Sequence, residues 1–108
     1  MGAQERPLGF FAAWKATDTW FRTSEKEKAQ FMKEIEKIFN VAKEKGVKMH
    51  GVYDCSWSSE WRYFTFWECP NLEILEETMG KLAAIGDINM YNEQRHFIGR
   101  LIPEEVIQ

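Results

Sequence analysis

The sequence lacks the features that mark several large classes of protein. Its 108 residues include only two cysteines, and fourteen Lys/Arg stand against seventeen Asp/Glu. The net charge of −3 argues against nucleic acid binding, which favours a basic surface. No apolar run approaches the roughly 18 residues of a membrane span, so we expect no association with a membrane.

Motifs of several enzyme classes are also missing. The sequence contains no glycine-rich phosphate loop, no Gly-x-Ser-x-Gly and no Cys-x-x-Cys. No group of Cys, His, Asp and Glu has the spacing of a metal site. These absences exclude most nucleotide-dependent and hydrolase functions. From them we expect the protein to bind no metal and no cofactor.

The two cysteines are not expected to form a disulfide. Cys55 and Cys69 fall on two strands of a predicted hairpin whose turn is 58–60. If Trp57 faces Trp61 across that turn, the cysteines are about six residues out of register, roughly 20 Å apart. That separation is beyond disulfide reach. Two lone thiols are typical of a reducing compartment, so we expect a cytoplasmic location.

The remaining composition is that of a folded domain. Hydrophobic residues make up 44% and charged residues 29% of the sequence. A chain of this length has room for one hydrophobic core. We therefore expect one domain over 1–108, with 1–7 and 103–108 as loose arms.

The pattern along the chain predicts four strands and two helices. Ser24 with Glu27 forms a capping box that begins the first helix, and Gly46 ends it. Asn71 is a suitable N-cap for the second helix, which ends near Gly86. Apolar and aromatic runs predict strands over 8–17, 47–57, 61–69 and 91–102.

The order β-α-β-β-α-β indicates an α+β, ferredoxin-like fold. Right-handed crossovers place both helices on one face of a four-stranded antiparallel sheet, with strands 8–17 and 61–69 in the centre. Both central strands are apolar on both faces, so the face without helices also needs a cover. A second copy is the simplest cover, which predicts a homodimer or higher assembly built as a dimeric α+β barrel.

Several short fragments resemble the darcynin-like family, a branch of the dimeric α+β barrel superfamily. The fragments lie between residues 8 and 102 and combine aromatic with polar residues. They are Lys15-Ala16-Thr17-x-x-Trp20, Ser24-x-x-Glu27, Tyr53-Asp54, Phe66-Trp67-Glu68 and Asn71-Leu72. The resemblance implies small-molecule chemistry in a pocket between sheet and helices. Members of the superfamily include cofactor-free monooxygenases, polyketide cyclases, muconolactone isomerases and haem-degrading enzymes. The resemblance assigns no catalytic residue.

The predicted hairpin brings ionisable residues together on one face. In the register above, His50 lies directly opposite Glu68, and Asp54 and Arg62 share their face. A carboxylate beside an imidazole favours its charged form and orients the ring, as in a general acid or base. We therefore predict His50, Asp54 and Glu68 as catalytic residues, with Lys15 as a neighbour. The alternative is an ordinary ion pair near the end of the sheet.

Aromatic residues form the second group of candidates. Five tryptophans and an aromatic content of 15% exceed ordinary usage. Rings on the central strands and the hairpin could form the walls of a flat pocket for a planar ligand. Core and interface packing is the alternative for each of them. The predicted ligand-binding residues are Trp14, Lys15, Tyr53, Trp67 and His96.

Haem binding is the least favoured hypothesis. His96 is either a haem ligand, a catalytic base or a structural group on its strand. In the haem-degrading relatives implied by the resemblance, the second helix supplies the axial ligand. Here residues 72–85 contain no histidine, and only Met79 could replace it.

The sequence therefore predicts a homodimeric protein that binds a small apolar or aromatic molecule. The sharper hypothesis is a cofactor-independent monooxygenase or a polyketide-cyclase-like enzyme. The alternative is a non-catalytic dimeric module that binds a ligand or a protein partner.

Overall fold

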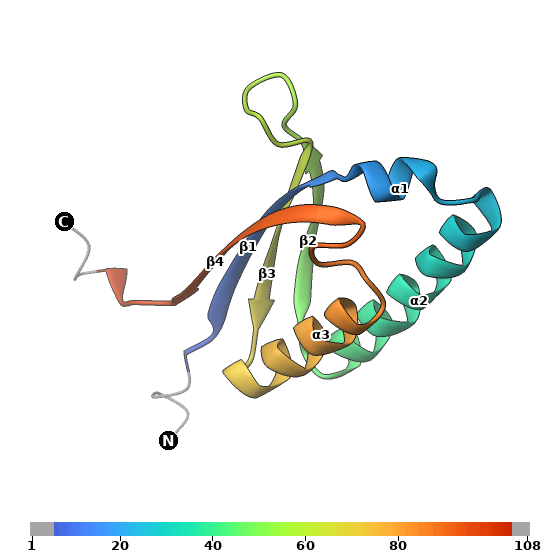
Figure 1. Ribbon diagram of the computed structural model, residues 1–108. Coiled ribbons are helices and arrows are strands. Elements are labelled where there is room, and N and C mark those ends of the chain that lie inside the picture. The colour runs from blue at the N-terminus through green and yellow to red at the C-terminus, as the bar shows by residue number, and fades with distance from the viewer. Residues whose placement is uncertain (1–5, 105–108) are drawn as a thin grey trace.

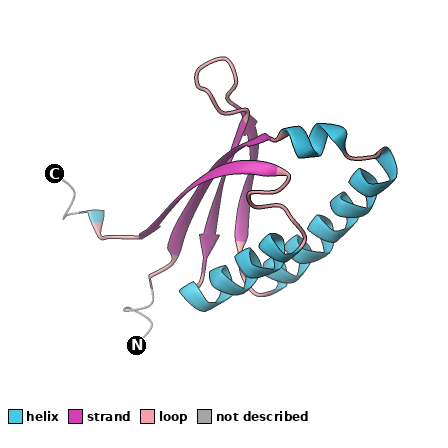
Figure 2. Ribbon diagram, in the orientation of Figure 1, coloured by secondary structure: helices cyan, strands magenta, loops and turns pink. Residues whose placement is uncertain are grey.

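The computed structural model describes residues 6–104, which form one sheet with helices packed on it. The strands are β1 (Leu8–Ala16), β2 (Lys48–Asp54), β3 (Tyr63–Cys69) and β4 (Asn92–Arg100). The helices are α1 (Asp18–Arg22), α2 (Glu25–Glu44) and α3 (Leu72–Ala84). All strand pairs are antiparallel, and the sheet order is β2-β3-β1-β4. The predicted ferredoxin-like fold is confirmed, with β1 and β3 in the centre and α2 and α3 on one side (Figures 1 and 2). The outermost residues of the predicted arms, 1–5 and 105–108, lie outside the described range.

The predicted helix boundaries rest on caps that the structure confirms. The Ser24 hydroxyl accepts a hydrogen bond from the Glu27 amide at 3.1 Å. The Asn71 side chain accepts one from the Ile74 amide at 2.9 Å. Gly46 follows the last turn of α2 with a φ of +101°, the left-handed conformation of a glycine cap.

A short additional helix, α1, was not predicted. Thr17 is its N-cap and accepts a hydrogen bond from the Trp20 amide at 3.4 Å. The Thr17 hydroxyl also donates to the Met90 carbonyl at 2.7 Å, which holds this corner against the loop before β4. The chain turns here because Thr17 satisfies backbone groups on both sides.

The predicted hairpin register was wrong by two residues at Glu68. Beside the hairpin loop, Asp54 already pairs with Tyr63, one residue from the predicted register, and a bulge in β2 adds the second residue. Lys48, not His50, lies opposite Glu68, and the pairing shifts by one residue between Met49 and Val52. Gly51 lies in the bulge with a φ of +97°, a backbone conformation that glycine adopts more readily than other residues. The Thr65 hydroxyl donates to the Gly51 carbonyl at 2.6 Å and so holds the bulge.

The hairpin strands are also shorter than predicted, because residues 55–62 form a loop that projects beyond the sheet (Figure 1). The Asp54 carboxylate accepts hydrogen bonds from the amide and the hydroxyl of Ser56, at 2.9 and 2.8 Å. These local bonds turn the chain away from the ladder. Both cysteines are free.

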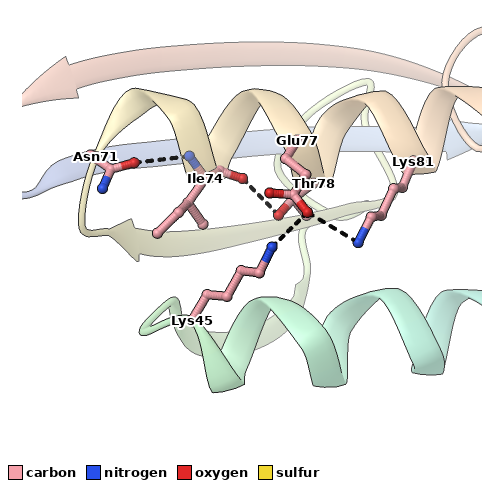
Figure 3. Close-up of polar contacts among 6 residues, drawn as sticks. All are labelled: Lys45, Asn71, Ile74, Glu77, Thr78 and Lys81. Carbon is pink, nitrogen blue, oxygen red and sulfur yellow. Dashed lines mark hydrogen bonds and ion pairs between the residues drawn. The ribbon is translucent and has the colours of Figure 1, made fainter.

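The core lies between the sheet and the two long helices. Its buried side chains come from alternate positions of the central strands and from the inner faces of the helices. They include Phe10, Ala12, Trp67, Ala42, Leu75 and Leu82. At the solvent side, Glu77 of α3 pairs with Lys45, the C-cap of α2, at 2.6 Å, which ties the two helices together (Figure 3). Glu77 also pairs with Lys81 of its own helix at 3.4 Å.

The opposite face of the sheet carries aromatic rings, and no helix of the described residues 6–104 covers it. Phe64 stacks between Phe11, at 5.5 Å between ring centroids, and Tyr53, at 5.2 Å. Phe97 packs beside Phe11 at 5.8 Å and is 59% exposed. The central strands therefore carry apolar side chains on both faces, as predicted. We call the aromatic face opposite the helices the open face.

No helix in the described range 6–104 is both long and apolar enough to cross a membrane.

Candidate functional site

A cavity of about 830 Å³ lies between the helix-covered face of the sheet and the helices. Its volume falls in the range of small-molecule sites. Aromatic and aliphatic side chains from β1, β3, α1 and α2 form most of its wall. The rings that line it include Phe10, Trp14, Trp20, Phe31, Phe39 and Trp67. Such a wall suits a ligand with flat apolar surfaces.

One corner of this cavity is polar, and three side chains form it. Asp87 lies in the loop between α3 and β4, and Asn92 and Gln94 lie two residues apart on β4. The Asn92 amide nitrogen donates to Asp87 Oδ1 at 3.0 Å, and that of Gln94 donates to Asp87 Oδ2 at 2.9 Å. We call these three residues the polar corner. Burial raises the pKa of the Asp87 carboxyl, and the two amide hydrogen bonds oppose that shift.

His96 extends the polar corner along β4. Its Nε2 lies 2.5 Å from Gln94 Oε1. Because Gln94 uses its amide nitrogen toward Asp87, its carbonyl oxygen accepts, and His96 Nε2 carries the proton. The imidazole packs on Phe10 at 5.1 Å. Burial lowers the pKa of His96, and the nearby Asp87 charge partly opposes this, so the ring is mainly neutral at pH 7.

Four of the five predicted ligand-binding residues lie in the lining of the cavity or beside it. Trp14 and Trp67 line its wall, and His96 lies beside its polar corner. Lys15 also contributes to the lining, although its Nζ pairs with Glu93 at 3.6 Å and lies 5.4 Å from the Trp61 ring. Tyr53 lies instead on the open face.

The predicted catalytic residues are brought together in part, but outside the lining of this cavity. His50 Nε2 lies 3.6 Å from Glu68 Oε2, although the bulge makes this contact diagonal. The His50 ring packs at 5.6 Å on Phe66, on the open face. Asp54 pairs instead with Arg62 at 3.5 Å, and the hydrogen bonds from Ser56 lower the pKa of its carboxyl. The predicted contact between His50 and Glu68 therefore exists, on the other side of the sheet from Trp14 and Trp67.

The polar corner was missed by the sequence analysis. Its signal was weak: an acidic residue directly after Gly86, and two amides at a spacing of two on the following strand. That spacing places Asn92 and Gln94 on the same face of β4 as His96. The contact with Asp87 depends on the path of the loop. Among residues 6–104, no three or more His, Cys, Asp or Glu side chains gather as metal ligands would.

A family model matches residues 9–107, which is nearly the whole chain. The chain belongs to DUF6616, a family of unknown function. No curated protein matches this DUF6616 protein. The darcynin-like resemblance stays a prediction, since the matching model is a different one.

Several solved structures share the fold of this DUF6616 protein. A mutant chlorite dismutase from Candidatus Nitrospira defluvii matches with a TM-score of 0.73 and 17% identity over 91% of this chain. A haem-binding protein from Thermus thermophilus matches with a TM-score of 0.75 and 15% identity over 94% of it. This chain spans about two-fifths of the length of each of them, 41% and 42%.

A third match has nearly the same length as this DUF6616 protein. It is a dimeric ferredoxin-like protein of unknown function from Thermobifida fusca, with a TM-score of 0.55 and 11% identity. The match covers 91% of this chain and 93% of that one. At such identities, the three likenesses show a common fold and no common activity.

Proposed function

We propose that this DUF6616 protein binds a small, flat and largely apolar molecule in the cavity between its sheet and its helices. One observation carries the proposal: a cavity of about 830 Å³ has mainly aromatic and aliphatic walls together with the polar corner. Specific small-molecule sites have this composition, since apolar walls supply affinity and a few polar groups supply orientation.

The finer part of the proposal is that the bound molecule reacts without a metal or a cofactor, as in a cofactor-independent monooxygenase or a polyketide-cyclase-like enzyme. The support is that Asp87 and His96 are ionisable groups at the edge of the cavity, each shifted by burial toward its neutral form. Groups whose pKa values are shifted by burial are common at sites where a proton is accepted or returned during a reaction. The pair His50 and Glu68 stays a second candidate, for a ligand bound on the open face.

Self-association through the open face is a further part of the proposal. Its support is the aromatic surface formed by Phe11, Phe64, Phe66, Phe97 and Tyr53, of which Phe97 and Tyr53 are more than half exposed. A second copy would remove this surface from water. If the molecule is a non-catalytic module, the same two surfaces would serve to bind a ligand and a partner.

Haem is the ligand named in the description of the matched Thermus thermophilus protein, and the residues here do not fit it. Proteins commonly hold haem iron with histidine or cysteine, and neither residue lines the cavity within the described range. Helix α3 contains no histidine. Met79 lines the cavity from α3, but methionine usually ligates haem iron together with a histidine.

A titration with naphthalene tests the proposed binding. We expect saturable quenching of tryptophan fluorescence, because Trp14, Trp20 and Trp67 line the cavity. Ala16 lines it from the end of β1, and Ala16→Leu should weaken binding by about tenfold, since the larger side chain occupies ligand space.

Ala29→Leu on the exposed surface of α2 is the matched control and should bind naphthalene like the wild type. Absence of saturable binding by the wild type, or equal affinity of Ala16→Leu, would overturn the proposal.

A further inference from the structure

The polar corner has a fixed geometry because its loop is held at both ends. The Asp87 amide donates to the Leu82 carbonyl at 3.0 Å, which ends α3. The Tyr91 amide donates to the Gly86 carbonyl at 2.9 Å, and the Thr17 amide donates to the Tyr91 carbonyl at 2.9 Å. The Asp87 carboxylate is therefore held in place at the wall of the cavity.

Within residues 6–104, the Asp87 carboxylate takes part in no ion pair with a lysine or an arginine. The two cationic side chains that line the cavity are engaged elsewhere, Lys15 with Glu93 and Arg62 with Asp54. The direct partners of Asp87 are the neutral amides of Asn92 and Gln94.

Asp87 also retains unused capacity to accept hydrogen bonds. An ionised carboxylate offers about four lone-pair sites, and the side chains of Asn92 and Gln94 fill one on each oxygen. Asp87 lies in the lining of a largely apolar cavity. A ligand that removes water from this corner without replacing its hydrogen bonds leaves the carboxylate desolvated, which costs free energy.

We propose that the cavity selects aromatic ligands that carry an O–H or N–H group, and that Asp87 accepts the hydrogen bond from that group. This inference rests on the proposed function, since it requires a ligand in the cavity. The rings of the wall take the apolar body of the ligand, and the polar corner takes its donor. A charge-assisted hydrogen bond in a site sheltered from water is stronger than a neutral one, which favours donor ligands over their methylated analogues.

Calorimetric titration of the whole chain with naphthol, naphthylamine and methoxynaphthalene tests the inference. The three probes share one ring system, and only the first two carry a donor. We expect at least one donor probe to bind about tenfold or more tightly than methoxynaphthalene. The tighter of the two identifies whether the preferred donor is O–H or N–H.

Asp87→Asn should reduce the preference to within about threefold, because it removes the charge and one acceptor oxygen. Asp18→Asn, on the exposed surface of α1, is the matched control and should keep the wild-type preference. If circular dichroism shows that Asp87→Asn does not fold, Asp87→Ser takes its place. If Asp87 had a purely structural role, its substitution would lower the free energy of unfolding without changing the ratio of probe affinities.

The outcomes separate the two proposals. If none of the three probes binds, the proposed function fails, and this inference fails with it. If methoxynaphthalene binds as tightly as the donor probes, the cavity binds ligands but the assignment of Asp87 is overturned. Retention of the full preference by the Asp87 variants overturns the assignment in the same way.

Discussion

Burial acts in opposite directions on the pKa values of Asp87 and His96 beside the cavity. It raises the pKa of the Asp87 carboxyl and lowers the pKa of the His96 imidazole, so both groups are shifted toward their neutral forms. Gln94 connects them, since it donates to Asp87 and accepts from His96. The amide cannot pass a proton between them, so its role is to hold the two groups in fixed orientations.

The pKa shift of His96 predicts a dependence of stability on pH. The ordinary imidazole pKa is 6.5, and burial lowers it in the folded protein. Because the unfolded chain then binds the proton more readily, this contribution to stability is complete well above pH 6.5 and is lost as pH falls through that value. His96→Gln should remove the part of the stability loss at low pH that is due to His96. Urea unfolding near about pH 5 and about pH 8 measures the free energy of unfolding of the wild type and the variant. An equal dependence on pH in the two proteins would contradict the prediction.

Among the elements, β2 departs most from its predicted form, and a single glycine lies at the bulge that causes part of the departure. Gly51 takes a φ of +97° in the bulge, and a Cβ added there would meet nothing within 4 Å. A larger residue at this position would therefore destabilise the fold through backbone strain alone. The bulge shifts the pairing by one residue and determines which β2 side chains face the cavity.

Two glycine substitutions separate strain from packing. Gly51→Ala should destabilise the fold by about 1–2 kcal/mol, because alanine disfavours this backbone conformation. Gly80→Ala, within α3, also adds a methyl group in open space and should stabilise the fold by about 0.5–1 kcal/mol. Urea unfolding measures both changes. A stabilising Gly51→Ala would show that the bulge relaxes to a regular ladder.

The whole molecule has two apolar surfaces, one on each side of its sheet. The helices enclose one of them around the cavity, and the open face presents the other to solvent. Large exposed apolar surfaces are typical of interfaces between subunits. The open face is therefore the surface on which we propose that a second copy packs.

A charge placed on the open face tests this arrangement. We expect the wild type to sediment at about twice the 12.8 kDa mass of one chain. Phe97→Lys should convert it to a monomer with unchanged far-ultraviolet circular dichroism, because a buried lysine at an interface lacks a partner. Leu72→Lys, at an exposed position on α3, is the control and should leave the assembly unchanged. A wild-type monomer would contradict the proposed dimer.

The order of the strands and the two long helices, the caps of these helices and the two-sided apolar strands follow from the sequence alone. Each depends on neighbours within a few residues, such as Ser24 with Glu27 or Asn71 with Ile74, or on the period of two along a strand. The aromatic residues Trp14 and Trp67 were also predicted at the ligand site from their strand positions, and both line the cavity.

Only the tertiary structure decided which polar groups meet at that cavity. The hairpin loop and the bulge at Gly51 together moved His50 out of register with Glu68, and the loop after α3 brought Asp87 to Asn92 and Gln94. Both outcomes depend on the path of the backbone through a bulge or a loop, which local patterns do not encode. A shift of one residue exchanges the two faces of a strand, so small departures in the backbone decide the contents of the site while the fold stays the same.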